Sequence, residues 1–195
     1  MQRITIIGAT GTGKSTLARQ LGSLLDVPVY HLDALYWRPG WVATPAGEWD
    51  GTLSRIVASD RWIVDGNFTE SLQRRLDEAD TIVFLDMPRR ISLGAVVRRR
   101  IEQFWRLPPG VAAGCRPMFN FRLFRWIWTF PTDHRPEFLR LLAVQPPEKQ
   151  VLILRSRSDI RRLLGRVESE LAGAAVERSG GVAVTEASSR ARPPA

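Results

Sequence analysis

Short apolar runs alternate with segments whose apolar residues recur at helical spacing along most of this chain. Five of the runs are short and rich in β-branched or aromatic residues, which is typical of buried strands. They span residues 3–7, 27–32, 62–66, 81–86 and 151–154. Strands that alternate with helices predict an α/β fold, with a parallel sheet covered by helices on both faces.

The segments between these runs predict the helices. The first helix follows Ser15, and the second begins at Thr44-Pro45, a pair typical of a helix N-terminus, and runs to about Ser59. Further helices are predicted over 69–76, 91–105, 119–130 and 158–171, whereas prolines and glycines break the segment 107–117. Periodicity ends at about Gly173, so we expect one domain over 1–172 and a disordered tail over 173–195.

Composition narrows the class of protein. The 195 residues are 44% hydrophobic and 25% charged, which suits one globular core. No apolar run approaches the roughly 18 residues of a membrane-spanning helix, and no cleavable leader pattern opens the chain, so we expect a cytoplasmic protein without a membrane partner. The single cysteine, Cys115, excludes an internal disulfide.

A glycine-rich loop lies between the first predicted strand and helix. Gly8 to Ser15 matches G-x-x-x-x-G-K-S, the P-loop pattern, in which backbone N–H groups and the helix N-terminus surround phosphate oxygens. Lys14 stands out because the chain has 26 arginines and only 2 lysines. We expect Lys14 to bind the β- and γ-phosphates of ATP and Ser15 to ligate Mg²⁺. The predicted nucleotide-binding residues are Gly8, Thr10, Gly11, Thr12, Gly13, Lys14, Ser15 and Thr16.

Carboxylates follow three of the predicted strands. Asp86 ends the most apolar one, where an acidic residue would complete the Mg²⁺ site beside Ser15. Asp33 follows the second strand and would act as a general base or acceptor ligand, and Asp65-Gly66-Asn67 follows the third and would hold a polar acceptor. Other interpretations are a turn former for Asp86, a helix N-cap for Asp33 and a plain β-turn for 65–67.

Aromatic residues are dense between the second and third strands. Tyr36, Trp37, Trp41 and Trp49 would form a stacking wall for an acceptor that contains a ring, with Trp37 as the acceptor-binding residue. Trp49 is equally explained as part of the core. The remaining charged residues there are mainly Arg38 and Arg55, fewer than expected for an anionic acceptor, so we favour an acceptor hydroxyl activated by Asp33.

The positive charge of the chain is concentrated in one stretch. Eleven arginines and three acidic residues lie between Arg89 and Arg140, so this stretch carries a net charge of +8, equal to that of the whole chain. Arg98 and Arg99 would fold over the triphosphate and neutralise charge that develops during transfer. Three consecutive arginines on a helix cannot all face one cleft, so some of them are expected to be solvated.

The motifs together resemble the adenylate-kinase-like "DNA topology modulation" proteins over residues 1 to 165. The resemblance rests on Gly8 to Ser15, His31-Leu32-Asp33 with Trp37 and Gly40-Trp41, Trp62 to Asn67, Leu85 to Arg89, and Trp126 to Arg135. It implies a P-loop kinase fold of the nucleoside-monophosphate-kinase type, with a five-stranded parallel sheet. It also implies an acceptor-binding segment over about 33–60 and an arginine-rich lid over about 98–135.

The resemblance also implies roles for single residues. ATP phosphates would lie at Gly11, Gly13, Lys14, Ser15 and Thr16, lid arginines at Arg98 and Arg135, and the acceptor between Asp33 and Asp65. The chain departs from the family pattern around the lid, where it has Gly94, Pro117 and Arg122.

These observations favour an ATP- and Mg²⁺-dependent phosphotransferase, a monomer or homodimer that acts on an unidentified small molecule. One alternative is a nucleotide-responsive regulator whose basic lid contacts nucleic acid. We favour it less, because the chain has no recognisable nucleic-acid-binding motif and phosphate handling alone explains clustered arginine. Another alternative is a slow ATPase without an acceptor.

Overall fold

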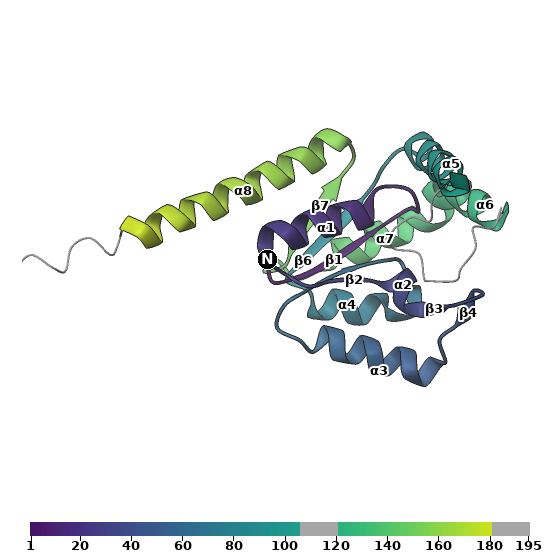
Figure 1. Cartoon of the computed structure of the whole chain (residues 1–195), viewed down its shortest axis with the longest axis horizontal. Helices are drawn as coiled ribbons and strands as arrows, with labels where there is room; N and C mark the ends of the chain where they lie inside the picture. The colour runs from purple at the N-terminus through teal and green to yellow at the C-terminus, as the bar shows by residue number, and fades with distance from the viewer. Residues whose placement is uncertain (106–120, 181–195) are drawn as a thin grey trace, which may run out of the picture.

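One parallel sheet forms the centre of the protein. The computed structural model describes residues 1–105 and 121–180. The strands are β1 (Arg3–Gly8), β2 (Val29–His31), β5 (Trp62–Asp65), β6 (Thr81–Leu85) and β7 (Gln150–Leu154). Their order in the sheet is β2, β5, β1, β6, β7, and every neighbouring pair is parallel (Figure 1). Strand β1 is therefore central, and both of its neighbours, β5 and β6, come later in the chain. The predicted α/β fold with a five-stranded parallel sheet is confirmed.

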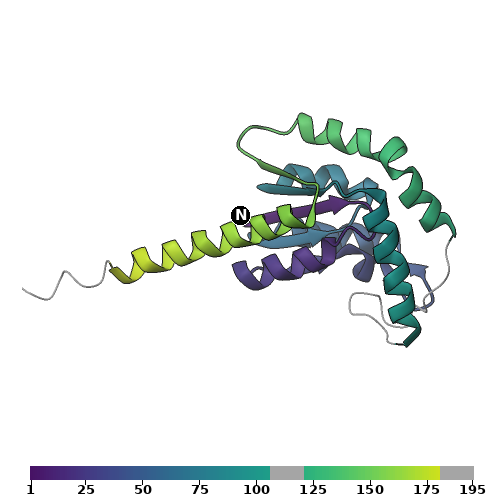
Figure 2. The ribbon, with the colours of Figure 1, turned by 90° about the horizontal axis from the view of Figure 1, so that it is seen from above.

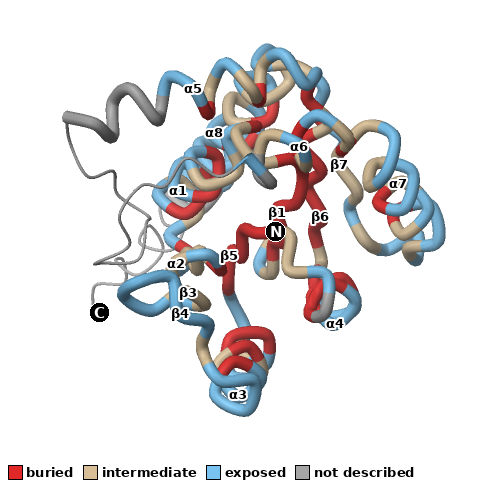
Figure 3. The backbone as a smooth tube through the Cα atoms, turned by 90° about the vertical axis from the view of Figure 1, so that its right-hand side faces the viewer, coloured by how far each residue is buried: buried red, intermediate tan, exposed pale blue. Residues whose placement is uncertain are grey.

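Helices cover both faces of this sheet. On one face lie α1 (Lys14–Leu25) and α8 (Arg157–Gly180). On the other lie α3 (Ala46–Val57), α4 (Leu72–Glu78), which follows the short 3₁₀ turn Thr69–Ser71, and α7 (Arg135–Ala143). Figure 3 shows the three inner strands β1, β5 and β6 buried between the two layers, whereas the edge strands β2 and β7 are largely only partly buried.

Alternation along β1 explains why both layers are needed. Ile4 and Ile6 pack into the cluster with α1 and α8, whereas Ile7 packs into the cluster with α3, α4 and α7. All three side chains are at most 1% exposed. A strand buried on both faces reads as a continuous apolar run, which is the pattern that identified it in the sequence.

The acceptor-binding segment begins differently from the prediction. The strand expected over 27–32 is only β2, and a short helix, α2 (Leu32–Tyr36), follows it at once. A small hairpin comes next, formed by β3 (Trp37–Arg38) and β4 (Val42–Ala43), and its turn places Gly40 and Trp41 at positive φ, 77° and 63°. A helix of five residues and strands of two residues are too short to show their period in the sequence.

Two helices lie beyond the carboxyl ends of the strands. They are α5 (Arg89–Trp105) and α6 (Phe121–Thr129), close to the expected ranges 91–105 and 119–130. A π-helix (Phe130–His134) joins α6 to α7, and Figure 2 shows this succession wrapping around one end of the sheet. The helix α7 was not predicted. The broken segment 107–117 lies outside the described residues.

The last helix is longer than the sequence suggested. It continues to Gly180, past the expected end at residue 171, and its distal half extends away from the rest of the protein (Figures 1 and 2). Residues 181–195 of the expected tail lie outside the described part. Among the described helices, none is long and apolar enough to cross a membrane.

Candidate functional site

The loop between β1 and α1 has the backbone of an anion-binding site. Gly11 and Gly13 adopt positive φ angles of 84° and 100°, a region that favours glycine. Gly13 caps α1, and this helix has no side-chain cap and no acidic residue in its first turn. Its first N–H groups and its dipole are therefore available to a negatively charged ligand.

Two side chains of the loop donate hydrogen bonds to its own backbone carbonyl oxygens. Nζ of Lys14 donates to the carbonyl oxygens of Gly8, at 2.8 Å, and Ala9, at 3.0 Å. The buried Thr12 hydroxyl donates to the same Ala9 oxygen at 2.7 Å. The Lys14 ammonium thus lies against the loop backbone and Thr12 holds the loop shape, while the phosphate-binding role of Lys14 remains a prediction.

The loop is also packed against α5. A Cβ atom on Gly11 would lie 2.5 Å from the backbone oxygen of Ser92 and 3.0 Å from Val96 of α5. A Cβ atom on Gly13 would have no heavy atom within 4 Å. Gly11 therefore allows α5 to pack closely against the loop, whereas Gly13 borders open space.

Ser15 is hydrogen-bonded to Asp65, whereas Asp86, the expected partner of Ser15 in the Mg²⁺ site, is bound by Arg135. Oγ of Ser15 donates to Oδ2 of Asp65 at 2.5 Å, and the Asp65 side chain is 4% exposed. Strands β5 and β6 both flank β1, so the sequence could not decide which strand would bring its carboxylate to the serine. The carboxylate available for a metal site with Ser15 is therefore that of Asp65.

Asp86 is bound by arginines instead. Nε and Nη2 of Arg135 donate to its two carboxylate oxygens at 2.7 and 2.8 Å, and Arg155 lies 3.6 Å away. The hydrogen bonds that Arg135 donates to Asp86 raise the pKa of Arg135 above its ordinary value. Arg135, predicted as a lid arginine, thereby ties the start of α7 to the carboxyl end of β6.

A buried arginine that the sequence did not single out lies under this site. Arg75 of α4 is 0% exposed and donates to the Thr5 hydroxyl and the Gly66 carbonyl through Nη1, and to the Phe68 carbonyl through Nη2. Burial lowers its pKa to about 10, although the charge of Asp65 opposes this shift. Arg75 is therefore still protonated at neutral pH and is a fixed positive charge near Asp65.

Gly66 and Asn67 support the loop rather than standing apart from it. Asn67 accepts from the Gly8 N–H at 3.1 Å and donates to the Gly8 carbonyl at 2.7 Å. This two-way bond fixes the segment after β5 against the start of the P-loop. The predicted acceptor role of Asn67 remains a prediction, but its amide is already engaged with the P-loop backbone.

The acceptor-binding segment brings the predicted aromatic residues together. Tyr36 contacts Trp37, Trp49 and Phe68 at ring-centroid distances of 4.9, 5.1 and 4.7 Å, and Trp37 contacts Trp41 at 5.8 Å. Trp49 is 7% exposed, so it belongs to the core, whereas Trp37 and Trp41 lie nearer the surface. Asp33 is exposed in the first turn of α2, one residue beyond the N-terminal residue of that helix.

A separate pocket of about 270 Å³ lies between β2, α2 and α3. It includes no predicted site residue and no part of the P-loop, and its lining residues are Tyr30, Leu35, Thr52, Arg55, Ile56 and Ser59.

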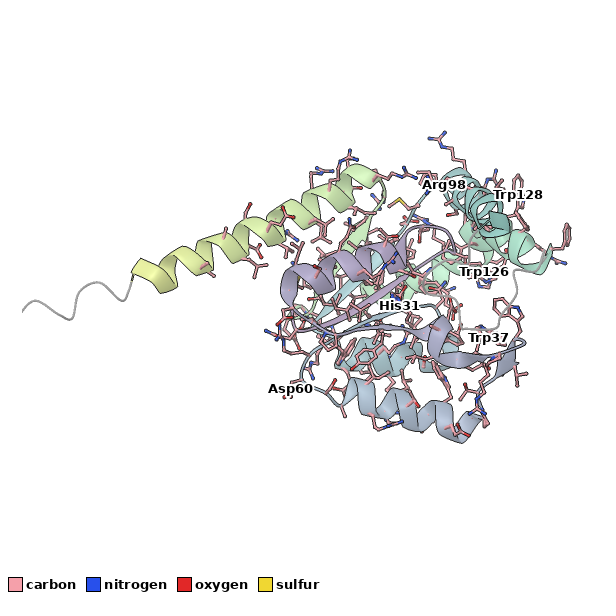
Figure 4. All side chains as sticks on the ribbon, viewed as in Figure 1. His31, Trp37, Asp60, Arg98, Trp126 and Trp128 are labelled. Atoms are coloured by element: carbon pink, nitrogen blue, oxygen red, sulfur yellow. The ribbon has the colours of Figure 1, made fainter. Side chains whose placement is uncertain are left out.

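The lid arginines are only partly described. Arg98 is exposed on α5, whereas the side chain of Arg99 lies outside the described part. Figure 4 labels Arg98 on α5, Trp126 and Trp128 on α6, His31 at the end of β2 and Trp37 in β3. Arg89 packs over the Trp128 ring at 4.2 Å, so this arginine of the basic stretch contacts a neighbouring helix.

The residues present fit Mg²⁺ bound together with a nucleotide. Among the described residues, no group of three or more His, Cys, Asp or Glu side chains could hold a metal. Mg²⁺ in phosphate-transfer sites usually takes one or two protein ligands, with phosphates and water completing its shell. Ser15 and Asp65 supply such a pair beside an open glycine loop.

Comparisons with known proteins agree with this geometry. No protein-family model matches the chain, and no curated protein matches its sequence. Shikimate kinase from Acinetobacter baumannii in complex with shikimate has a similar fold, with a TM-score of 0.58, 14% identity and coverage of 89% of this chain and 94% of that one. A putative kinase from Chloroflexus aurantiacus has a TM-score of 0.51, with 20% identity and coverage of 87% and 98%. A gluconokinase from Sinorhizobium meliloti has a TM-score of 0.50, with 15% identity and coverage of 91% and 97%. This chain therefore has the α/β fold of the P-loop kinases.

Proposed function

We propose that this protein is an ATP- and Mg²⁺-dependent phosphotransferase that phosphorylates a hydroxyl group of a small molecule. The observation that carries the proposal is the P-loop, in which Lys14 lies over the glycine loop and Ser15 faces the buried Asp65. The kinase folds of the structural neighbours support it.

Each part of the site would have a role in the transfer. The N–H groups at the start of α1 and the Lys14 ammonium would bind the phosphates of ATP, and Ser15 with Asp65 would hold Mg²⁺. The metal would neutralise charge on the phosphates. Lid arginines, Arg98 and Arg99 among them, would neutralise the charge that develops as the bond to the leaving ADP breaks.

Asp33 would serve the acceptor. Transfer forms a bond between the acceptor oxygen and the γ-phosphorus and breaks the bond to the bridging oxygen, so the hydroxyl proton must leave. An exposed carboxylate beyond β2 is a suitable acceptor for that proton. A phosphate acceptor would need arginines instead, and Arg38 is already paired with Glu48.

The names of two structural neighbours point in the same direction. Shikimate and gluconate, to which those names refer, are hydroxylated acids. We therefore place hydroxylated small molecules, with or without a carboxylate, ahead of nucleoside monophosphates as acceptors.

The test is ADP release from ATP and Mg²⁺ against a panel of hydroxylated acids, sugars, nucleosides and nucleoside monophosphates. We expect one acceptor class to stimulate release, with Lys14→Ala abolishing it and Asp33→Asn abolishing the acceptor-dependent part alone. Unchanged turnover by Asp33→Asn would remove the base role from Asp33. A flat background that still depends on Lys14 would instead indicate a slow ATPase.

A second candidate follows from the basic stretch and from the family that the sequence resembles. Arg89, Arg90 and Arg98 are exposed on α5, next to the P-loop, so a nucleotide-gated contact with nucleic acid has a surface to use. DNA binding that responds to ATP and survives 150 mM salt would favour this candidate. Binding that is lost at modest salt would be non-specific attraction.

A further inference from the structure

Three side chains from three elements form one hydrogen-bonded row at the carboxyl end of the sheet. Oγ of Ser15 donates to Oδ2 of Asp65 at 2.5 Å, and Nδ1 of His31 lies 2.5 Å from the other oxygen, Oδ1. The Asp65 side chain is 4% exposed, so little of it is left for water. Both oxygens of this buried carboxylate are therefore held by protein groups.

The sheet explains how His31 reaches Asp65. The two residues are direct neighbours in the parallel pairing of β2 with β5. Val29, two residues before His31, lies over Gly22 of α1, so the alternation along β2 points His31 to the α1 side as well. Ser15 is in the first turn of the same helix, and the three side chains therefore converge on one face of the sheet.

We propose that His31 is a positioning residue for the metal site, an inference that rests on the proposed function. Nδ1–H of His31 donates to Oδ1 of Asp65 and thereby fixes the rotation of the carboxylate, so that Oδ2 faces Ser15. The role is that of an outer-shell partner, which orients a ligand without touching the metal or the substrate. It sets how much Mg²⁺ strengthens nucleotide binding.

The charges around Asp65 do not replace this hydrogen bond. Arg75 acts on Asp65 through its charge, but it donates hydrogen bonds to Thr5, Gly66 and Phe68. Lys14 donates to the loop carbonyls of Gly8 and Ala9. A point charge attracts the carboxylate without selecting its rotation, whereas a hydrogen bond to one oxygen does select it.

The test separates metal coupling from nucleotide binding. ATP affinity is measured by calorimetry with Mg²⁺ and again with excess EDTA, for the wild type, His31→Ala and His31→Asn. For His31→Ala we expect affinity in Mg²⁺ to fall about 10- to 100-fold, the usual loss for an outer-shell partner. Affinity in EDTA should stay within about twofold, because the P-loop contacts remain. His31→Asn should recover most of the loss, since its side-chain amide can donate near the position of Nδ1.

The other histidine of the chain supplies a matched control. His134 contacts the rings of both Trp126 and Phe130, and its change to Asn should leave both affinities as in the wild type. Equal losses for His31→Ala in Mg²⁺ and in EDTA would overturn the inference, as would an unchanged Mg²⁺ affinity or a failure of Asn to rescue. A wild-type protein that does not bind ATP would overturn the proposed function itself, and with it this inference.

Discussion

At the scale of single residues, Gly11 and Gly13 share a left-handed backbone but have different surroundings. Alanine at either position has to adopt a φ that costs about 1–2 kcal/mol. Gly11→Ala also places a methyl group 2.5 Å from the Ser92 oxygen, whereas Gly13→Ala meets nothing within 4 Å. We expect urea denaturation to show a free energy of unfolding lower for Gly11→Ala by at least about 1 kcal/mol relative to Gly13→Ala. Equal losses would mean that α5 can move away from the loop.

The stability of the fold depends on pH through Asp80. Burial alone would raise its pKa, but the Thr81 hydroxyl and the backbone N–H groups of Arg3 and Gln2 donate to it and hold its pKa below the ordinary value. A carboxylate whose pKa is lower in the folded state stabilises the fold above its unfolded pKa, and this stability is lost as the pH falls through the folded pKa.

We therefore expect Asp80→Asn to lower the free energy of unfolding at pH 7 by roughly 1–2 kcal/mol, because a partly screened charged acceptor is lost. The difference between variant and wild type should shrink as the pH falls below 4. Denaturation curves across that range measure it, and a constant difference would show that the charge is not responsible.

The sequence was informative about some site residues and silent about others. Lys14 and Ser15 were predictable because the P-loop pattern fixes both identity and spacing. Asp65 could be recognised as a polar residue at a strand end, but its choice over Asp86 depends on which strand presents its carboxylate to α1. The importance of Arg75 and His31 comes from contacts across 70 and 34 positions of the chain, which no local pattern reports.

At the scale of elements, alanine substitutions at two helical glycines are expected to change the stability of the protein in opposite directions. Gly51 is exposed in α3 with no heavy atom within 4 Å of an added Cβ, so Gly51→Ala should stabilise the protein by about 0.5–1 kcal/mol. Gly22 is buried in α1, and a Cβ there would lie 2.3 Å from Val29. Gly22→Ala should therefore destabilise, and thermal melts of the two variants should move in opposite directions. A lower melting temperature for Gly51→Ala would contradict the helix propensity argument.

Elements whose apolar residues recur at a regular spacing were predicted well, and elements without such a spacing were not. The five strands and most long helices could be identified because their apolar residues pack on the two faces of a sheet that helices cover on both sides. Helix α7 was missed although Pro136, at its second position, is typical of a helix N-terminus; this helix has only nine residues and follows a π-helix directly. The β3–β4 hairpin was missed because each strand has only two residues.

At the scale of the whole molecule, α8 divides into a packed half and a projecting half. Leu163 and Val167 are 4% and 2% exposed in the cluster with α1, whereas Leu171 is 36% exposed. We expect a chain that ends after residue 172 to keep its free energy of unfolding within about 0.5 kcal/mol, because only surface is removed. Leu163→Ala in the full chain should cost about 2–4 kcal/mol in the same denaturation experiment. A comparable loss from the truncation would show that the distal half also stabilises the fold.

The central place of β1 has a consequence for how the protein is made. Ile4 pairs with Ile63 and with Thr81, so the strand that leads into the P-loop finds its two partners only after both have been synthesised. Strand β1 therefore leaves the ribosome before its partners, and its apolar side chains stay exposed until β5 and β6 have been synthesised. Folding of the nascent chain is then delayed by topology, and the P-loop is completed only after β5 and β6, which follow it along the chain.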